Sequence, residues 1–113
     1  MQVNREKKLK KLLVVEVSNA LLDEVSLVND TFVTVMGAQL SPTLEHATIY
    51  ISVLPLDKSE AVLEKLNHRI YSIQQVLNKR LNLRIVPKIR FEIDTTEERA
   101  QKIEELLEKV KDE

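Results

Sequence analysis

Apolar residues recur at three- and four-residue steps in two long stretches of the chain, which is the spacing of one face of an α-helix. The first stretch covers residues 5–25, with apolar positions at Leu9, Leu12, Leu13, Val17, Ala20, Leu21 and Val25. The second runs from about residue 60 to Leu81 on Leu63, Leu66, Ile70, Ile73 and Leu77. This single apolar stripe predicts a helix, and neither glycine nor proline interrupts it, so the pattern leaves open whether the helix is kinked at residues 69–71.

Two further stretches have the pattern of β-strands joined by a hairpin. Residues 32–40 are rich in valine and threonine and contain Gly37, the only glycine of the chain, which indicates a bulge. Residues 47–53 alternate between apolar and polar side chains. The short connection through Ser41-Pro42 makes these two strands antiparallel neighbours.

A third strand is expected within residues 83–93. Its odd-numbered apolar residues are expected to face the core, and they are Leu83, Ile85, Ile89, Phe91 and Ile93. The even-numbered residues on the opposite face are Arg84, Lys88, Arg90 and Glu92. Pro87 has no backbone N–H to donate, so this strand either lies at a sheet edge or begins only after the proline.

The last predicted element is a helix over residues 96–110. Thr95 and Glu98 have the spacing of a capping box, and Ala100, Ile103, Leu106, Leu107 and Val110 share one face. The element order is therefore α-β-β-α-β-α, an α+β fold in one domain that spans residues 1–113. A right-handed crossover makes the second and third strands parallel, so the second strand is central and helices cover one face of a three-stranded mixed sheet.

The composition excludes several classes of function. The chain has no cysteine, and its only histidines, His46 and His68, lack the spacing of metal ligands or of a catalytic set. One glycine cannot form a glycine-rich phosphate loop. No apolar run reaches the length of a membrane span, and the basic and apolar start lacks the features of a signal peptide. We therefore expect a cytoplasmic protein that is not an enzyme and needs no cofactor or metal.

Positive charge is concentrated although the whole chain has a net charge of −1. Residues 1–90 have a net charge of +4 and residues 91–113 of −5, and no acid occurs between residues 65 and 90. The candidate phosphate-binding residues of that window are Lys65, Arg69, Lys79, Arg80, Arg84, Lys88 and Arg90, and a second cluster near the N-terminus holds Lys7, Lys8, Lys10 and Lys11. Either they bind a nucleic acid, or they pair with the glutamates of the last helix.

Tyr50 belongs to the uncovered face of the predicted sheet. Its even number in the second strand places it with His46 and Thr48 and with the basic residues of the third strand. A tyrosine among cations can stack on a nucleic-acid base, although a cross-strand packing role is the more common one.

Three blocks of the sequence resemble successive segments of bacterial ribosome-binding factor A. They are "VTVMGAQLSPTLEHATIYISVL" at residues 33–54, "LRIVPKIRFEID" at 83–94 and "ERAQKIEELL" at 98–107. The resemblance covers essentially the whole chain and implies a type II K-homology-like domain without a GxxG loop. It also implies binding to the 16S rRNA of the immature small (30S) ribosomal subunit during late maturation and 5′-end processing. The resemblance further implies that the protein acts as a monomer, supports growth in the cold and is released with the help of assembly GTPases.

The sequence departs from the family pattern at two places. The family has a small-residue kink of Ala-x-Gly type between its two middle helices, whereas the aligned residues here are Arg69, Ile70 and Tyr71. A usual Asp-Pro-Arg segment after the first helix is replaced by residues 24–30. The alternative function is a protein-interaction module that docks a partner through its edge strand or an exposed helix face without contacting RNA.

Overall fold

The computed structural model describes residues 2–22 and 30–96, with side chains from Arg5 onward. The described elements are α1 (Gln2–Leu22), β1 (Phe32–Leu40), β2 (His46–Leu54), the short 3₁₀-helix η1 (Leu56–Lys58), α2 (Ser59–His68), α3 (Ile70–Arg80) and β3 (Lys88–Ile93). The predicted helix over residues 96–110 lies outside the described residues, apart from its start. So do the last residues predicted for the first helix.

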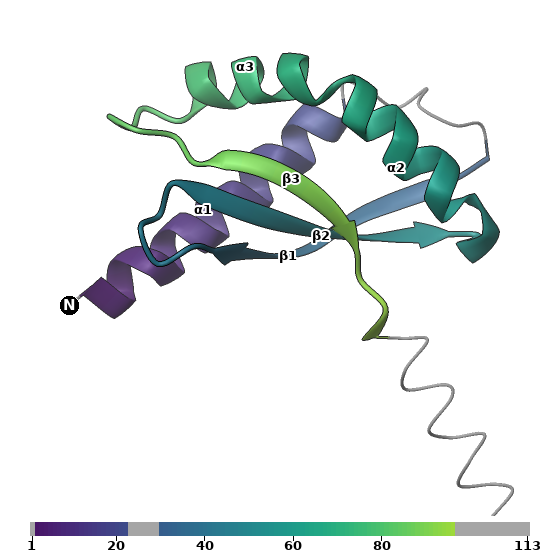
Figure 1. The fold of residues 1–113 in the computed structure, drawn as a ribbon, viewed down its shortest axis with the longest axis horizontal. Helices are drawn as coiled ribbons and strands as arrows, with labels where there is room; N and C mark the ends of the chain where they lie inside the picture. The colour runs from purple at the N-terminus through teal and green to yellow at the C-terminus, as the bar shows by residue number, and fades with distance from the viewer. Residues whose placement is uncertain (1, 23–29, 97–113) are drawn as a thin grey trace, which may run out of the picture.

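The strands form one sheet in the order β1-β2-β3, as the sequence predicts. β1 pairs antiparallel with β2, and β2 pairs parallel with β3 (Figure 1). The register shifts between Val35 and Gly37, so Met36 is the extra residue of the predicted bulge. The α+β, K-homology-like architecture is therefore confirmed for the described elements.

One face of the sheet is buried, and none of the helices within residues 2–22 and 30–96 covers the other, which we call the open face. All four odd-numbered residues of β2 between Ala47 and Val53 are almost completely buried, and Ile89 and Phe91 of β3 join them. They pack against a helix layer to which α1 contributes Leu13 and Val17, α2 contributes Val62 and Leu66, and α3 contributes Ile73 and Leu77. The even-numbered residues of β2 and β3 face away from this core.

The helical stretch predicted up to Leu81 is kinked, because the chain breaks at Arg69. This residue leaves the helical backbone conformation at φ −102° and ψ 7°, ending α2 and preceding α3. α2 contacts β2 and β3, whereas α3 contacts α1 as well as β3. The break lets each half bury its apolar residues against different partners, so tertiary packing produces the kink without a small residue.

The third strand lies at the edge of the sheet and begins only after Pro87, so both predicted possibilities are confirmed. Residues 82–87 form an irregular connection, so Leu83 and Ile85 do not face the core; their side chains are 41% and 69% exposed. Arg84 lies in the same connection, and its predicted place on the strand beside Lys88 and Arg90 is wrong. The N–H of Lys88 donates to Glu45 beside β2, and that of Ile89 donates to Gln74 at the free edge. By alternation the missing N–H of Pro87 falls on the free edge, where the pairing with β2 does not need it.

Gln74 of α3 binds the free edge of β3 at this point. Its side-chain amide donates to the carbonyl of Pro87 at 3.0 Å and accepts from the N–H of Ile89 at 2.9 Å. An unpaired strand edge exposes donors and acceptors that favour association with other chains. Gln74 therefore satisfies two backbone groups of β3 and fixes α3 against the strand.

We expect Gln74→Ala to lower the free energy of unfolding by about 2 kcal/mol, since two partly buried hydrogen bonds are lost at roughly 1 kcal/mol each. Gln75→Ala is the matched control, because Gln75 is the exposed neighbour on the same helix. It should change stability by less than about 0.5 kcal/mol. Urea unfolding followed by circular dichroism measures both, and equal stabilities for the two variants would contradict this role of Gln74.

Candidate nucleic-acid interface

Four of the candidate cations lie where α3 leads into β3. Lys79 and Arg80 end α3, Arg84 lies in the connection, and Lys88 starts β3; all four are exposed. We call these four residues the basic end. The N–H of Lys88 donates to the carbonyl of Glu45 at 2.9 Å, which places the hairpin between β1 and β2 next to the basic end.

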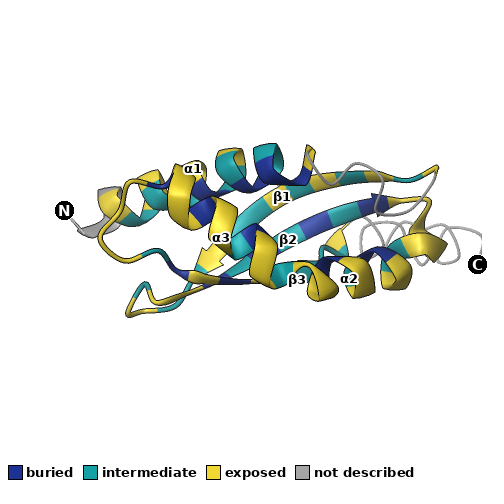
Figure 2. Ribbon diagram, turned by 90° about the horizontal axis from the view of Figure 1, so that it is seen from above, coloured by how far each residue is buried: buried dark blue, intermediate teal, exposed yellow. Residues whose placement is uncertain are grey.

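The lysine cluster of α1 lies toward the same end of the molecule. In both Figure 1 and Figure 2 the N-terminal end of α1, the β1–β2 hairpin and the loop before β3 lie together. Lys7, Lys8 and Lys11 are exposed and Lys10 is half-buried. An ion pair between Arg80 Nη1 and Glu16 Oε2 at 3.5 Å links the end of α3 to α1.

Lys65 and Arg69 are not brought into this group. Lys65 lies in the last turn of α2, and Arg69 is the residue between α2 and α3. The full length of α3 separates Arg69 from Lys79, about 15 Å at the rise of an α-helix. Both residues are exposed, so they form a second cationic group beyond the far end of α3.

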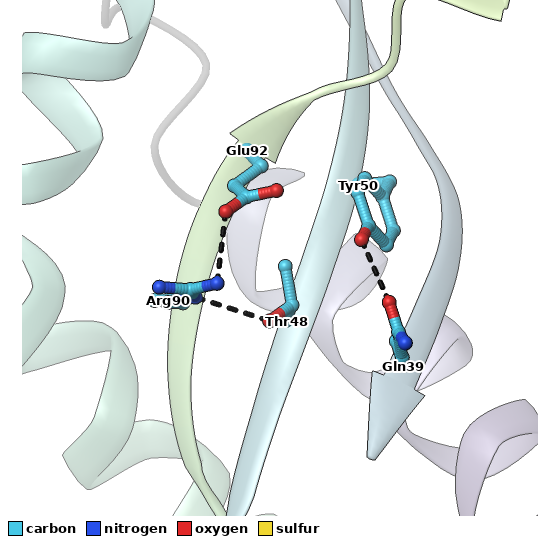
Figure 3. Close-up of polar contacts among 5 residues, drawn as sticks. All are labelled: Gln39, Thr48, Tyr50, Arg90 and Glu92. Atoms are coloured by element: carbon cyan, nitrogen blue, oxygen red, sulfur yellow. Dashed lines mark hydrogen bonds and ion pairs between the residues drawn. The ribbon is translucent and has the colours of Figure 1, made fainter. Parts of the chain in front are cut away.

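Arg90 projects from the open face, where Figure 3 shows its contacts. Its Nε donates to Thr48 Oγ1 on β2 at 3.1 Å, and Nη2 lies 2.9 Å from Glu92 Oε1. Both side chains of this ion pair are substantially exposed, so it contributes little to stability and competes weakly with an anionic ligand. The strand pairing places Lys88 opposite His46 and Arg90 opposite Thr48.

Tyr50 lies on the same face, as the sequence predicts, and is half-buried. Its hydroxyl donates to Gln39 Oε1 of β1 at 2.8 Å (Figure 3). The sequence pattern gave no role to Gln39 or to the pairs made by Glu16 and Glu92. The bulge at Met36 reverses the alternation along β1, so that Ala38 and Leu40 face the core and Gln39 faces the open side, where the strand register brings it near Tyr50.

Pairing of the cations with the glutamates of the last predicted helix stays a prediction, because these residues lie outside the described part of the chain: Glu97, Glu98, Glu104, Glu105 and Glu108. Within residues 2–22 and 30–96, the acids that pair with candidate cations include Glu16 with Arg80 and Glu92 with Arg90. In the same ranges no cluster of three metal-ligating side chains occurs. None of the helices described there is long and apolar enough to cross a membrane.

Solved structures share this fold. The crystal structure of ribosome-binding factor A from Thermus thermophilus matches with a TM-score of 0.55 at 22% identity, covering 74% of this chain and 93% of that chain. A solution structure of a Thermotoga maritima protein described as a putative ribosome binding factor A matches with a TM-score of 0.54 at 29% identity, covering 74% of this chain and 84% of that chain.

Sequence comparison extends the similarity to almost the whole chain. Ribosome-binding factor A of Mycoplasmopsis pulmonis is 34% identical over 101 residues, which cover 89% of this chain and 88% of the relative. The protein of the same name from Halothermothrix orenii is 32% identical and covers 100% of this chain and 93% of its own. The model of the family "Ribosome-binding factor A" matches residues 5–107. The chain therefore belongs to the ribosome-binding factor A family.

Proposed function

We propose that this protein is a non-catalytic assembly factor that binds the 16S rRNA of the immature small ribosomal subunit and supports its late maturation, including processing of the 5′ end. The observation that carries the proposal is the basic end, where four exposed cations gather from a helix terminus, a connection and a strand start. The relatives' shared name, ribosome-binding factor A, supports a ribosomal partner.

In this mechanism the cations neutralise backbone phosphates at fixed separations. The basic end and Arg90 provide one group of contacts, Lys65 and Arg69 a second, and the α1 lysines a third. Phosphate contacts fix register and orientation without reading base sequence, so the protein recognises the shape of its RNA. Binding one conformer of unfinished rRNA more tightly than the others shifts the population toward that conformer, which requires no chemical step.

The proposal also covers the cellular setting. The protein acts as a monomer in the cytoplasm, its partner is the small subunit, and assembly GTPases assist its release. Membership of the ribosome-binding factor A family is what supports each of these points.

The alternative function is a protein-interaction module, and the uncharged outer strand β1 favours it. This outer strand runs from Phe32 to Leu40 without a charged residue or a proline, and Phe32 is 75% exposed. Such an edge can accept a strand from another protein. Digesting the rRNA of the bound complex separates the two functions: loss of the chain from the ribosomal proteins supports RNA binding, and retention supports the alternative.

The affinity for immature small subunits should fall steeply with salt. If about five phosphates are contacted, the logarithm of the binding constant against the logarithm of salt concentration should slope at roughly −3.5 for unpaired RNA. Binding to gradient-purified immature subunits between about 50 and 200 mM salt measures this slope. A slope near zero would rule out phosphate neutralisation as the source of affinity.

Three matched charge reversals locate the interface. Arg84→Glu reverses a charge of the basic end, and Lys65→Glu reverses a charge of the second cationic group. Lys58→Glu is the control, because Lys58 is an exposed cation of η1 that belongs to neither group. We expect Arg84→Glu to weaken subunit binding about tenfold, equivalent to about 1.4 kcal/mol, and to make the salt slope shallower by about 1. Lys65→Glu should produce a measurable loss as well, and Lys58→Glu should bind like the parent.

Circular dichroism serves as the folding control for all three variants. An equal loss of subunit affinity for Lys58→Glu and Arg84→Glu would mean that the net charge of the chain, rather than the basic end, determines binding.

A further inference from the structure

The open face of the sheet carries two hollows at neighbouring positions along β2. The first is lined by polar and basic side chains, among them Gln39, Ser41, His46, Thr48 and Arg90. The second lies further along the strands, and its lining includes Met36, Gly37, Tyr50, Glu92 and Asp94. One hollow therefore presents a guanidinium, and the other presents an aromatic ring beside two carboxylates.

No apolar side chain lies directly opposite Tyr50 in the strand pairing. Its partner position on β1 is Gly37, which has no side chain, and its partner on β3 is Glu92, which pairs with Arg90. A Cβ atom added at Gly37 would meet nothing within 4 Å, so the space beside the ring is open. The residue directly opposite on β1 therefore offers the ring no side chain to pack on, and β1 contacts Tyr50 through the hydrogen bond of Gln39 to its hydroxyl.

The orientation of both Tyr50 and Arg90 is fixed by hydrogen bonds. Gln39 holds the tyrosine hydroxyl at 2.8 Å, and Thr48 holds Arg90 Nε at 3.1 Å (Figure 3). Fixed side chains lose less conformational entropy when a ligand binds. The guanidinium has five N–H donors, so the contacts with Thr48 and Glu92 leave others available for an anion.

An aromatic plane and a guanidinium at diagonal positions of adjacent strands match the two halves of a nucleotide. Tyr50 pairs with Glu92, so Arg90 is two residues away along β3. Diagonal positions on neighbouring strands are about 7–8 Å apart. A base stacked on Tyr50 and the phosphate of the same nucleotide near Arg90 span a comparable distance.

We propose that the open face binds one unpaired nucleotide of RNA, with its base stacked on Tyr50 over Gly37 and its phosphate held by Arg90, next to Lys88 and His46. This inference rests on the proposed function and adds a second type of contact, to a base rather than to backbone alone. Stacking on aromatic side chains is how proteins commonly bind splayed-out bases.

The carboxylates of the second hollow determine which way the nucleotide lies. Both carboxylates are engaged at one oxygen, because Glu92 Oε1 pairs with Arg90 and Asp94 Oδ1 accepts from the N–H and the hydroxyl of Thr96. Two carboxylates still make this hollow less favourable for a phosphate than for a base. Carboxylates accept hydrogen bonds from exocyclic amino groups such as N4 of cytosine. Uracil is almost the same size but has a carbonyl at that position, so the site should prefer cytosine to uracil.

The chain offers a direct optical test, because Tyr50 and Tyr71 are its only tyrosines and it has no tryptophan. Tyr71 is 74% exposed on α3, in the helix layer rather than on the open face. Tyr71→Phe therefore leaves Tyr50 as the only tyrosine that emits. Tyr50→Phe is the matched control, since it keeps Tyr71 and reports any loss of signal caused by light absorption of the RNA.

Each variant is titrated with single-stranded oligocytidylate and oligouridylate of about eight nucleotides, the length that a single binding domain covers. We expect saturable quenching of Tyr50 by oligocytidylate, weaker quenching by oligouridylate, and no saturable change for Tyr71. Unquenched Tyr50 in the presence of excess RNA would overturn the proposal. Equal quenching by both oligonucleotides would overturn the contact between the base and the carboxylates.

Two substitutions provide an independent readout by a binding assay with the same oligonucleotides. Tyr50→Leu removes the ring and should weaken binding about five- to a hundredfold. Gly37→Val fills the open space beside the ring, where the structure accommodates a Cβ, and should produce a similar loss while circular dichroism stays unchanged. Parent-like affinity of both variants would also overturn the proposal.

These outcomes are separable from those of the proposed function. If the parent chain binds immature subunits but Tyr50 is not quenched, the nucleotide site is refuted and the ribosomal role stands. If Tyr50 is quenched by oligocytidylate but the parent chain does not bind subunits, the ribosomal role is refuted and the nucleotide site stands.

Discussion

Burial of a single face of the sheet is the constraint on which the rest of the structure depends. The odd-numbered side chains of β2 are buried against α1, α2 and α3, and this central strand is paired on both sides. Strand side chains alternate between faces, so burying one set commits the other set to the open face. Thr48, Tyr50, Arg90 and their neighbours share the open face for this reason, without any interaction that selects them individually.

The crossover from β2 to β3 produces the cationic groups. A parallel connection must bring the chain back across the sheet, so the end of α3 returns to the edge at which β2 begins. Lys79 to Lys88 are close in sequence, and the hydrogen bond from Lys88 to Glu45 places the end of this return beside the β1–β2 hairpin. Gln74 closes the strand edge at the same place, which gives the basic end a fixed support.

Two types of surface thus occur on one small domain. The cationic groups at the two ends of α3 suit a folded RNA backbone, because point charges at fixed separations favour shape over sequence. The open face combines an anchored tyrosine, an anchored arginine and two hollows, which suit a base that has left its stack. A partly folded rRNA offers both features, and a mature, fully paired RNA offers fewer unpaired bases.

The amino-acid pattern determined the strands and their order, the bulge near Gly37 and the face on which Tyr50, Lys88 and Arg90 lie. Periods of 2 and 3.6 residues are local properties, and each one states which side of an element is buried. The family resemblance carried by residues 33–54 and 83–94 was likewise readable from the chain, and the family match agrees with it.

Tertiary structure alone decided the break at Arg69, the irregular path of residues 82–87, the separation of Lys65 and Arg69 from the basic end, and the contacts of Gln39, Gln74 and Glu16. Each of these depends on where a distant segment packs: α3 bends toward α1, and Gln74 replaces a strand partner for Ile89. Local periodicity is nearly the same for a straight and a kinked helix. Only the competition between partners for buried area selects one of them.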